Sequence, residues 1–182
     1  MRMEETCGAA NVDIVCDVAT DAFSTATERD ALCGFLDQAR DALIRKVDGL
    51  SDQDARMAAT VSSLSLLGLL KHSAVWERRW FQIIFAGRDF PDEWPTVADE
   101  GQDATFALSG DDTVESVVAY YLEQIAVSRE IVAGVDLDAR CARSDLVDEN
   151  LRWVAMHLIQ ETARHAGHAD IIREAIDGSR GL

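Results

Sequence analysis

The sequence predicts an all-α protein, a four-helix bundle with a long connection between its second and third helices. Apolar residues recur at intervals of three and four along four separate stretches, which is the spacing of amphipathic helices. The two prolines, Pro91 and Pro95, both lie in the predicted connection, so neither interrupts a helical stretch. With 182 residues and 48% hydrophobic content, the chain is long and apolar enough for one domain with a buried core.

The first helix is predicted over residues 27–49. The run Thr-Glu-Arg-Asp that starts at Thr27 is typical of a helix N-terminus, and Gly49 is typical of an end. Between them, apolar residues follow helical spacing at Leu32, Phe35, Leu36, Leu43 and Val47. Residues 51–55 are expected to form a short turn before the next helix.

The second helix, predicted over residues 65–87, carries the first candidate site residue. His72 lies on the same side of this helix as four apolar residues, Leu69, Val75, Trp76 and Ile83. We therefore expect His72 to face the interior of the bundle.

The connection over residues 88–109 is long and acidic. Connections between helices in bundles usually span about two to eight residues, so this one is expected to pack over one end of the site. The third helix follows over residues 113–134, with apolar residues at Val114, Val117, Val118, Tyr121, Ile125 and Ile131.

The fourth helix, over residues 150–178, is the most informative part of the chain. Its apolar positions are Leu151, Val154, Leu158, Ile172 and Ile176, and Glu161, His165 and His168 are expected to continue this core-facing stripe. Buried titratable groups need partners. Each histidine could be satisfied by a hydrogen bond within the core, and Glu161 with His165 could form a buried ion pair. A divalent metal is the third interpretation, because Glu-x-x-x-His places two ligands one turn apart.

His72 supplies the third ligand that the metal interpretation needs. Metal sites in helical bundles are built from inward side chains on facing helices. His72, Glu161 and His165 would give two imidazoles and one carboxylate, with coordination positions left over, which is typical of catalytic sites. This ligand set suits zinc, nickel, iron(II) and manganese alike.

The residues around these candidates resemble the DinB-like superfamily. The resemblance rests on Leu-Leu-Lys-His72, on the segments 75–81 and 150–153, and above all on His157-Leu-Ile-Gln-Glu161-Thr-Ala-Arg-His165-Ala-Gly-His168. It runs from about Phe23 to the C-terminus. Glu161 in place of a histidine makes the chain most similar to the mycothiol-dependent transferase branch, which includes a maleylpyruvate isomerase.

The resemblance implies a four-helix bundle that binds a divalent metal, zinc as the first choice and nickel as the second. His72 on the second helix and Glu161 and His165 on the last would be the ligands. His168 stands where many relatives carry glutamine, so it is placed next to the site and not among the ligands.

The predicted function is that of a metal-dependent enzyme of the thiol-transferase type. The metal would activate a low-molecular-weight thiol such as mycothiol against an electrophilic small molecule. His168 and Arg164 are the predicted catalytic residues, and Trp76 and Arg79 are predicted to bind the thiol cofactor. Isomerase or hydrolase chemistry at the same site stays open. The alternative is a non-catalytic stress-response bundle that binds a metal or a small molecule.

Composition and charge restrict the class further. The chain carries 17 basic and 33 acidic residues, a formal net charge of −16, which argues against nucleic acid as a partner. We expect no membrane span, no signal peptide and a cytoplasmic location, with the four cysteines as reduced thiols. A homodimer is a further possibility. Residues 1–22 are expected to be an arm, either disordered or laid along the bundle, and residues 23–182 the domain.

Overall fold

A computed structural model describes residues 27–89 and 103–181. Its helices are α2 (Glu28–Arg45), α3 (Asp52–Ala55), α4 (Leu66–Arg78), the π-helix η1 (Arg79–Phe85), the 3₁₀-helix η2 (Ala104–Phe106), α5 (Val114–Val132) and α6 (Leu151–Asp177). The described residues contain no β-strand, so the all-α prediction is confirmed. The predicted arm and both prolines lie outside the described residues.

Polar caps fix where the long helices begin. The side chains of Thr27, Ser65, Thr113 and Asn150 each accept a hydrogen bond from a backbone N–H in the first turn of the helix that follows. Such caps satisfy donors that have no partner within the helix. At the other end of α6, Gly178 has φ +78°, a left-handed conformation that glycine adopts without strain. The predicted helix starts are therefore confirmed.

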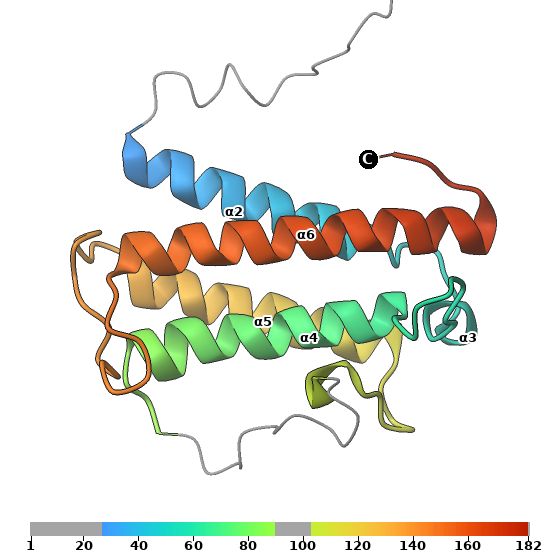
Figure 1. The fold of residues 1–182 in the computed structure, drawn as a ribbon, viewed down its shortest axis with the longest axis horizontal. Coiled ribbons are helices and arrows are strands. Elements are labelled where there is room, and N and C mark those ends of the chain that lie inside the picture. The colour runs from blue at the N-terminus through green and yellow to red at the C-terminus, as the bar shows by residue number, and fades with distance from the viewer. Residues whose placement is uncertain (1–26, 90–102, 182) are drawn as a thin grey trace, which may run out of the picture.

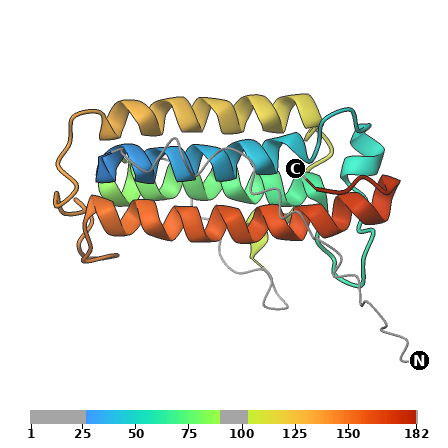
Figure 2. The same ribbon diagram turned by 90° about the horizontal axis from the view of Figure 1, so that it is seen from above.

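The four long helices lie side by side with nearly parallel axes (Figures 1 and 2). Helices α2 and α6 run in one direction, and α4 and α5 run in the opposite direction (Figure 1). Because the successive helices α4 and α5 run the same way, the chain must return along the bundle between them. This requirement explains the long connection, and its described end, η2, lies beside α4.

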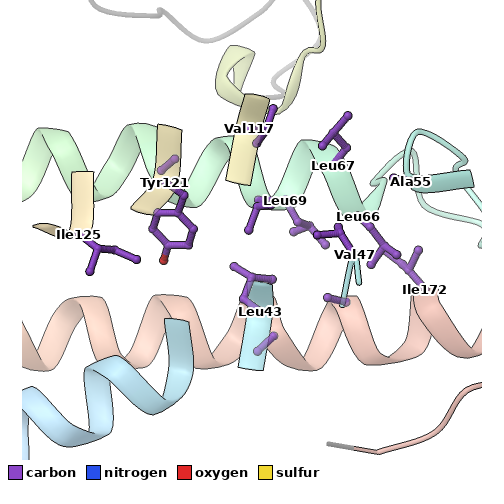
Figure 3. Close-up of a cluster of buried hydrophobic side chains, with 14 residues drawn as sticks. Leu43, Val47, Ala55, Leu66, Leu67, Leu69, Val117, Tyr121, Ile125 and Ile172 are labelled. Carbon is purple, nitrogen blue, oxygen red and sulfur yellow. The ribbon is translucent and has the colours of Figure 1, made fainter. Parts of the chain in front are cut away.

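The bundle core consists of two apolar clusters. The larger one joins α2, α4, α5 and α6 through fully buried side chains such as Leu43, Leu69 and Tyr121 (Figure 3). The other gathers around η1 and the first turns of α6, with Trp80, Phe81 and Val154 among its members.

The prediction of one continuous α-helix over residues 65–87 is wrong for its last two turns. Residues 79–85 form a π-helix instead of continuing α4 as an α-helix. The carbonyls of Ile84 and Phe85 accept hydrogen bonds from the backbone N–H groups of Arg143 and Ala142, which come from the α5–α6 connection. Contacts of this kind come from a segment distant in the sequence, so helical periodicity cannot predict them.

Two expectations from composition are tested only within the described part of the chain. There, no helix is both long and apolar enough to cross a membrane. Cys33 is exposed and Cys141 is buried, and neither forms a disulfide.

Candidate functional site

A cavity of about 380 Å³ lies between α4 with η1 on one side and α6 on the other. Its lining combines imidazoles, indoles and carboxylates from these helices and from the segment 103–106. The side chains that line it are His72, Ser73, Trp76, Trp80, Asp103, Phe106, His157, Leu158, Glu161, Thr162 and His165. The expectation that the long connection packs over the site holds for its described end.

Two of the three predicted metal ligands face each other across this cavity. His72 on α4 is only 8% exposed, as expected from the apolar side of that helix. Its ring centroid lies 4.8 Å from that of His165 on α6, with the two planes nearly perpendicular at 84°. Helix packing thus brings together two imidazoles that are 93 positions apart in the sequence.

A hydrogen-bonded chain holds the His72 ring. Its Nδ1 lies 2.5 Å from Thr105 Oγ1, and Thr105 Oγ1 donates to Asp103 Oδ1 at 2.6 Å. The backbone N–H of Thr105 and the indole N–H of Trp76 also donate to the Asp103 carboxylate, at 2.9 Å and 3.1 Å. Burial alone would raise the pKa of Asp103, but these donors together with the nearby His72 lower it below its usual value.

The hydrogen bonds through Thr105 and Asp103 determine which nitrogen of His72 carries the proton. Because Asp103 is ionised, the single hydroxyl proton of Thr105 is used in the bond to Asp103. Thr105 Oγ1 can therefore only accept from His72, so Nδ1 is the protonated nitrogen. The lone pair of His72 is then on Nε2, and a carboxylate behind the ring is the arrangement that orients metal-binding histidines.

Both facing imidazoles are neutral at pH 7. Burial and then the neighbouring His165 lower the pKa of His72 to about 4. Burial is also the main reason that the pKa of His165 is lowered. Neutral imidazoles can bind a metal or accept a proton, whereas charged ones cannot.

Replacing Thr105 by valine should release the His72 ring. The Nδ1–H donor would lose its buried acceptor, which typically costs about 1–3 kcal/mol, and the two tautomers of His72 should become mixed. Long-range ¹H–¹⁵N correlation spectra of the imidazoles distinguish the tautomers directly. Thr105→Ser keeps the hydroxyl and serves as the matched control. A single Nδ1–H tautomer that persists in Thr105→Val would contradict this account.

The segment 103–106 is held against α4 by a close backbone approach. A Cβ atom at Gly68, one turn before His72, would lie only 2.9 Å from the carbonyl oxygen of Phe106. The absence of that side chain lets Phe106 stack on His72, with ring centroids 3.9 Å apart and planes at 5°. One face of the His72 ring is thus covered by Phe106.

Glu161, the third predicted ligand, lines the same cavity but has another partner. Its carboxylate lies 3.0 Å from the guanidinium of Arg164, one turn further along α6. Within residues 27–89 and 103–181, no three histidine, cysteine or acidic side chains are arranged to hold a metal ion. The two imidazoles therefore face each other, whereas the carboxylate of Glu161 pairs with Arg164.

The expectation that His168 faces the core is wrong. His168 is exposed and is not part of the cavity lining, and its ring centroid lies 6.0 Å from that of His165. The buried stripe of α6 instead passes through small residues at Thr162, Ala166 and Ala169. With about 3.6 residues per turn, this stripe leaves Glu161 and His165 at its edge and turns His168 toward solvent.

Of the remaining predicted site residues, Trp76 lines the cavity, and Arg79 and Arg164 each contact a residue of the lining. The guanidinium carbon of Arg79 lies 4.6 Å from the centroid of the Trp76 ring, within the range of a cation–π interaction. Arg79 and Arg164 are not part of the lining. Arg164 is exposed beside Glu161.

Several side chains of the site were not found from the sequence, among them Asp103, Thr105, Phe106 and His157. Asp103, Thr105 and Phe106 come from the long connection, whose position over α4 no helical periodicity can predict. His157 had a signal, because it precedes Glu161 and His165 at the same four-residue spacing and therefore shares their side of α6.

The donor types in the cavity are those that divalent metals bind. Two imidazoles and a carboxylate line it, although no three of the described side chains are arranged around one point. Nδ1 of His165 is buried without a hydrogen-bond partner in the described structure. An unpartnered buried nitrogen is unfavourable, and a group bound against this ring would compensate for it.

A helical bundle with facing imidazoles in a partly open cavity defines a small-molecule site of the DinB-like class. The family model described as mycothiol-S-transferase matches residues 31–178. The chain belongs to this family, and the resemblance to the mycothiol-dependent branch of the DinB-like superfamily is thereby confirmed.

The solved structures support the fold. The chain is similar to the crystal structure of a conserved protein from Enterococcus faecalis, with a TM-score of 0.59 and 14% sequence identity. The match covers 84% of this chain and 99% of the other. At this identity the likeness concerns the fold alone. A comparison with curated proteins gave no match.

Proposed function

We propose that this protein is a metal-dependent thiol S-transferase that joins a low-molecular-weight thiol, such as mycothiol, to an electrophilic small molecule. The observation that carries the proposal is the pair of neutral imidazoles, His72 and His165, facing each other in the cavity of a mycothiol-S-transferase family member. A bound divalent ion, zinc or nickel, would supply the positive charge that lowers the pKa of a thiol beside it.

Each residue of the site has a task in this proposal. His72, held through Thr105 and Asp103, offers Nε2 as a ligand, and His165 offers its imidazole from the opposite helix. Glu161 completes the set when it leaves Arg164. Arg164 then becomes available for an acidic group of the thiol or of the electrophile.

Trp76, Arg79 and His168 would act on the thiol cofactor. Trp76 and Arg79 form a paired surface at the cavity edge, suited to a polar molecule that presents both a flat face and acceptor groups. His168, exposed beside His165, would exchange the proton that the thiol loses with solvent.

Adding mycothiol to metal-loaded protein should raise its melting temperature. A ligand that binds only the folded state adds about 2.7 kcal/mol at a hundredfold excess over its Kd. For a domain of this size, each kcal/mol corresponds to roughly 2–4 °C. The metal-free protein and His165→Ala are the controls, and neither should respond. A fall in melting temperature would indicate that thiol removes the metal, and no shift with mycothiol, bacillithiol or glutathione would contradict the transferase proposal.

A second candidate function is non-catalytic binding of a metal or a small molecule. It is favoured by the engagement of Glu161 with Arg164, which leaves no assembled set of three ligands among the described residues. Turnover separates the two functions. Protein that holds one metal and responds to thiol, but transfers it to no electrophile, would favour the binding function.

A further inference from the structure

The cavity is bounded by two rows of side chains that repeat every fourth residue. One row, on α4 and η1, consists of His72, Trp76 and Trp80, and the other, on α6, consists of His165, Glu161 and His157. The helices run in opposite directions, so an eight-residue step on one matches an eight-residue step on the other. His72 meets His165 with ring centroids 4.8 Å apart, and Trp80 meets His157 at 4.5 Å.

The two ends of the cavity differ in chemistry. Around the facing imidazoles, the lining offers polar groups from Ser73, Asp103 and Thr162, with Glu161 alongside. Around Trp80, the lining consists of flat or apolar side chains, His157 and Leu158. A polar thiol therefore finds hydrogen-bonding partners at the first end, and an apolar group finds contact area at the second.

The aromatic end extends to the surface through Trp153. This indole stacks on His157, with centroids 5.0 Å apart and planes at 7°, and lies 5.6 Å from Trp80. It is 38% exposed, although large aromatic side chains are usually well buried. We name the group of Trp80, His157 and Trp153 the aromatic wall. Its ring faces and edges form a surface that leads from solvent to the cavity.

We propose that the aromatic wall binds the electrophilic co-substrate, and that this co-substrate carries a planar aromatic ring. Ring faces favour other rings through stacked and edge-to-face contacts. His157 and His165 are two turns apart on α6, about 12 Å along the helix axis. An aryl group bound near His157 and a thiol bound near His165 can together span this distance. The assignment of a substrate class rests on the proposed thiol transfer, whereas the binding of an aromatic ring does not.

The transfer can be written with an aryl halide, 1-chloro-2,4-dinitrobenzene, as the probe. The thiolate sulfur forms a bond to the ring carbon that bears chlorine, and the carbon–chlorine bond breaks. Chloride leaves with the bonding electrons, and the thiol proton goes to solvent. The step needs no oxidant or reductant.

Binding is tested first, by calorimetric titration of full-length protein with the unreactive ring 1,3-dinitrobenzene. His157→Leu and Trp80→Leu should each raise the Kd about tenfold, which corresponds to the loss of one aromatic contact. His157→Phe keeps a ring and should bind within about threefold of the unmodified protein. Phe35→Leu, an aromatic loss at an exposed position of α2 away from the cavity, should not change the Kd.

A loss of binding must be distinguished from a loss of folding in each variant. Trp80 belongs to the apolar core, so its variant must give the circular dichroism of the unmodified protein to be used. The His157 variants carry the test if it does not, because His157 is less buried than Trp80. No binding by the unmodified protein, or equal Kd values in His157→Leu and Phe35→Leu, would overturn the aromatic wall as a binding surface.

Kinetics then tests the assignment to the electrophile. The ratio of kcat/KM for 1-chloro-2,4-dinitrobenzene to that for iodoacetamide, which has no ring, should fall about tenfold in His157→Leu. An equal loss for both electrophiles would overturn the assignment, because the wall would then serve the thiol. Absence of transfer to either electrophile by the unmodified protein would contradict the proposed function, while the calorimetric result would still decide whether the wall binds aromatic rings.

Discussion

Replacing either His72 or His165 by alanine is expected to abolish stoichiometric metal binding, whereas His168→Ala is expected to keep most of it. His72 and His165 face each other in the cavity, while His168 is exposed and outside the lining. Loss of a ligand removes a bond to the metal directly. Replacing a residue that only orients a metal ligand typically lowers metal affinity roughly 10- to 100-fold. Replacing the ligands His72 or His165 should therefore lower it by more than that.

Elemental analysis of protein purified without added metal measures this effect, with one metal per chain as the reference. Glu161→Gln provides an intermediate case, since it removes the carboxylate charge but keeps an oxygen donor. Equal metal loss in all three histidine variants would make His168 a ligand. A full equivalent of metal in His72→Ala would overturn the proposed ligand set.

The sequence predicted the helices because their signals are local. Each helix start carries a capping side chain next to an apolar repeat, as at Thr27 and Asn150, and neither signal depends on distant residues. The inward position of His72 follows from its four apolar neighbours on the same side of the predicted second helix. The same reasoning failed for His168. Steps of four and three residues do not match the 3.6 residues of a helical turn, so a stripe extended through polar positions gradually moves away from the buried side of α6.

The parts of the site that could not be predicted depend on contacts across the bundle. The π-helix η1 is held by backbone hydrogen bonds from the α5–α6 connection. Asp103 and Thr105 reach His72 only because Gly68 admits the connecting segment so closely. Sequence spacing describes one element at a time, so it cannot place a loop on a helix that lies more than 30 positions earlier.

A buried ion pair holds α4 on the side away from the cavity. Arg40 of α2 donates from two nitrogens to the two oxygens of Glu77, at 2.5 Å and 3.3 Å, and also to Asp37 at 2.7 Å. Arg40 is 4% exposed and Glu77 is 1% exposed. Burial opposes the charge of Arg40, but the neighbouring Glu77 and Asp37 outweigh it and raise the pKa of the guanidinium.

Glu77→Ala should therefore destabilise the protein strongly. It leaves the Arg40 charge buried without its partner, next to the void that the shorter side chain creates. Breaking one half of a buried pair typically costs about 3–5 kcal/mol. Urea unfolding followed by circular dichroism measures the loss. Asp37→Asn is the matched control, because Asp37 is only half-buried and its loss should cost about 1 kcal/mol or less.

The double variant Arg40→Met with Glu77→Leu distinguishes a missing partner from a missing contact. Apolar side chains of similar size can replace a buried pair with little loss, so the double variant should recover most of the stability that Glu77→Ala loses. A double variant no more stable than Glu77→Ala, or a loss below about 1 kcal/mol in Glu77→Ala, would contradict an unpaired buried charge as the cause. Glu77 lies on α4 next to Trp76 and just over one turn after His72, and both of these rings line the cavity. The metal content of the double variant would therefore report whether the ion pair also fixes the rotation of α4 that turns both rings into the cavity.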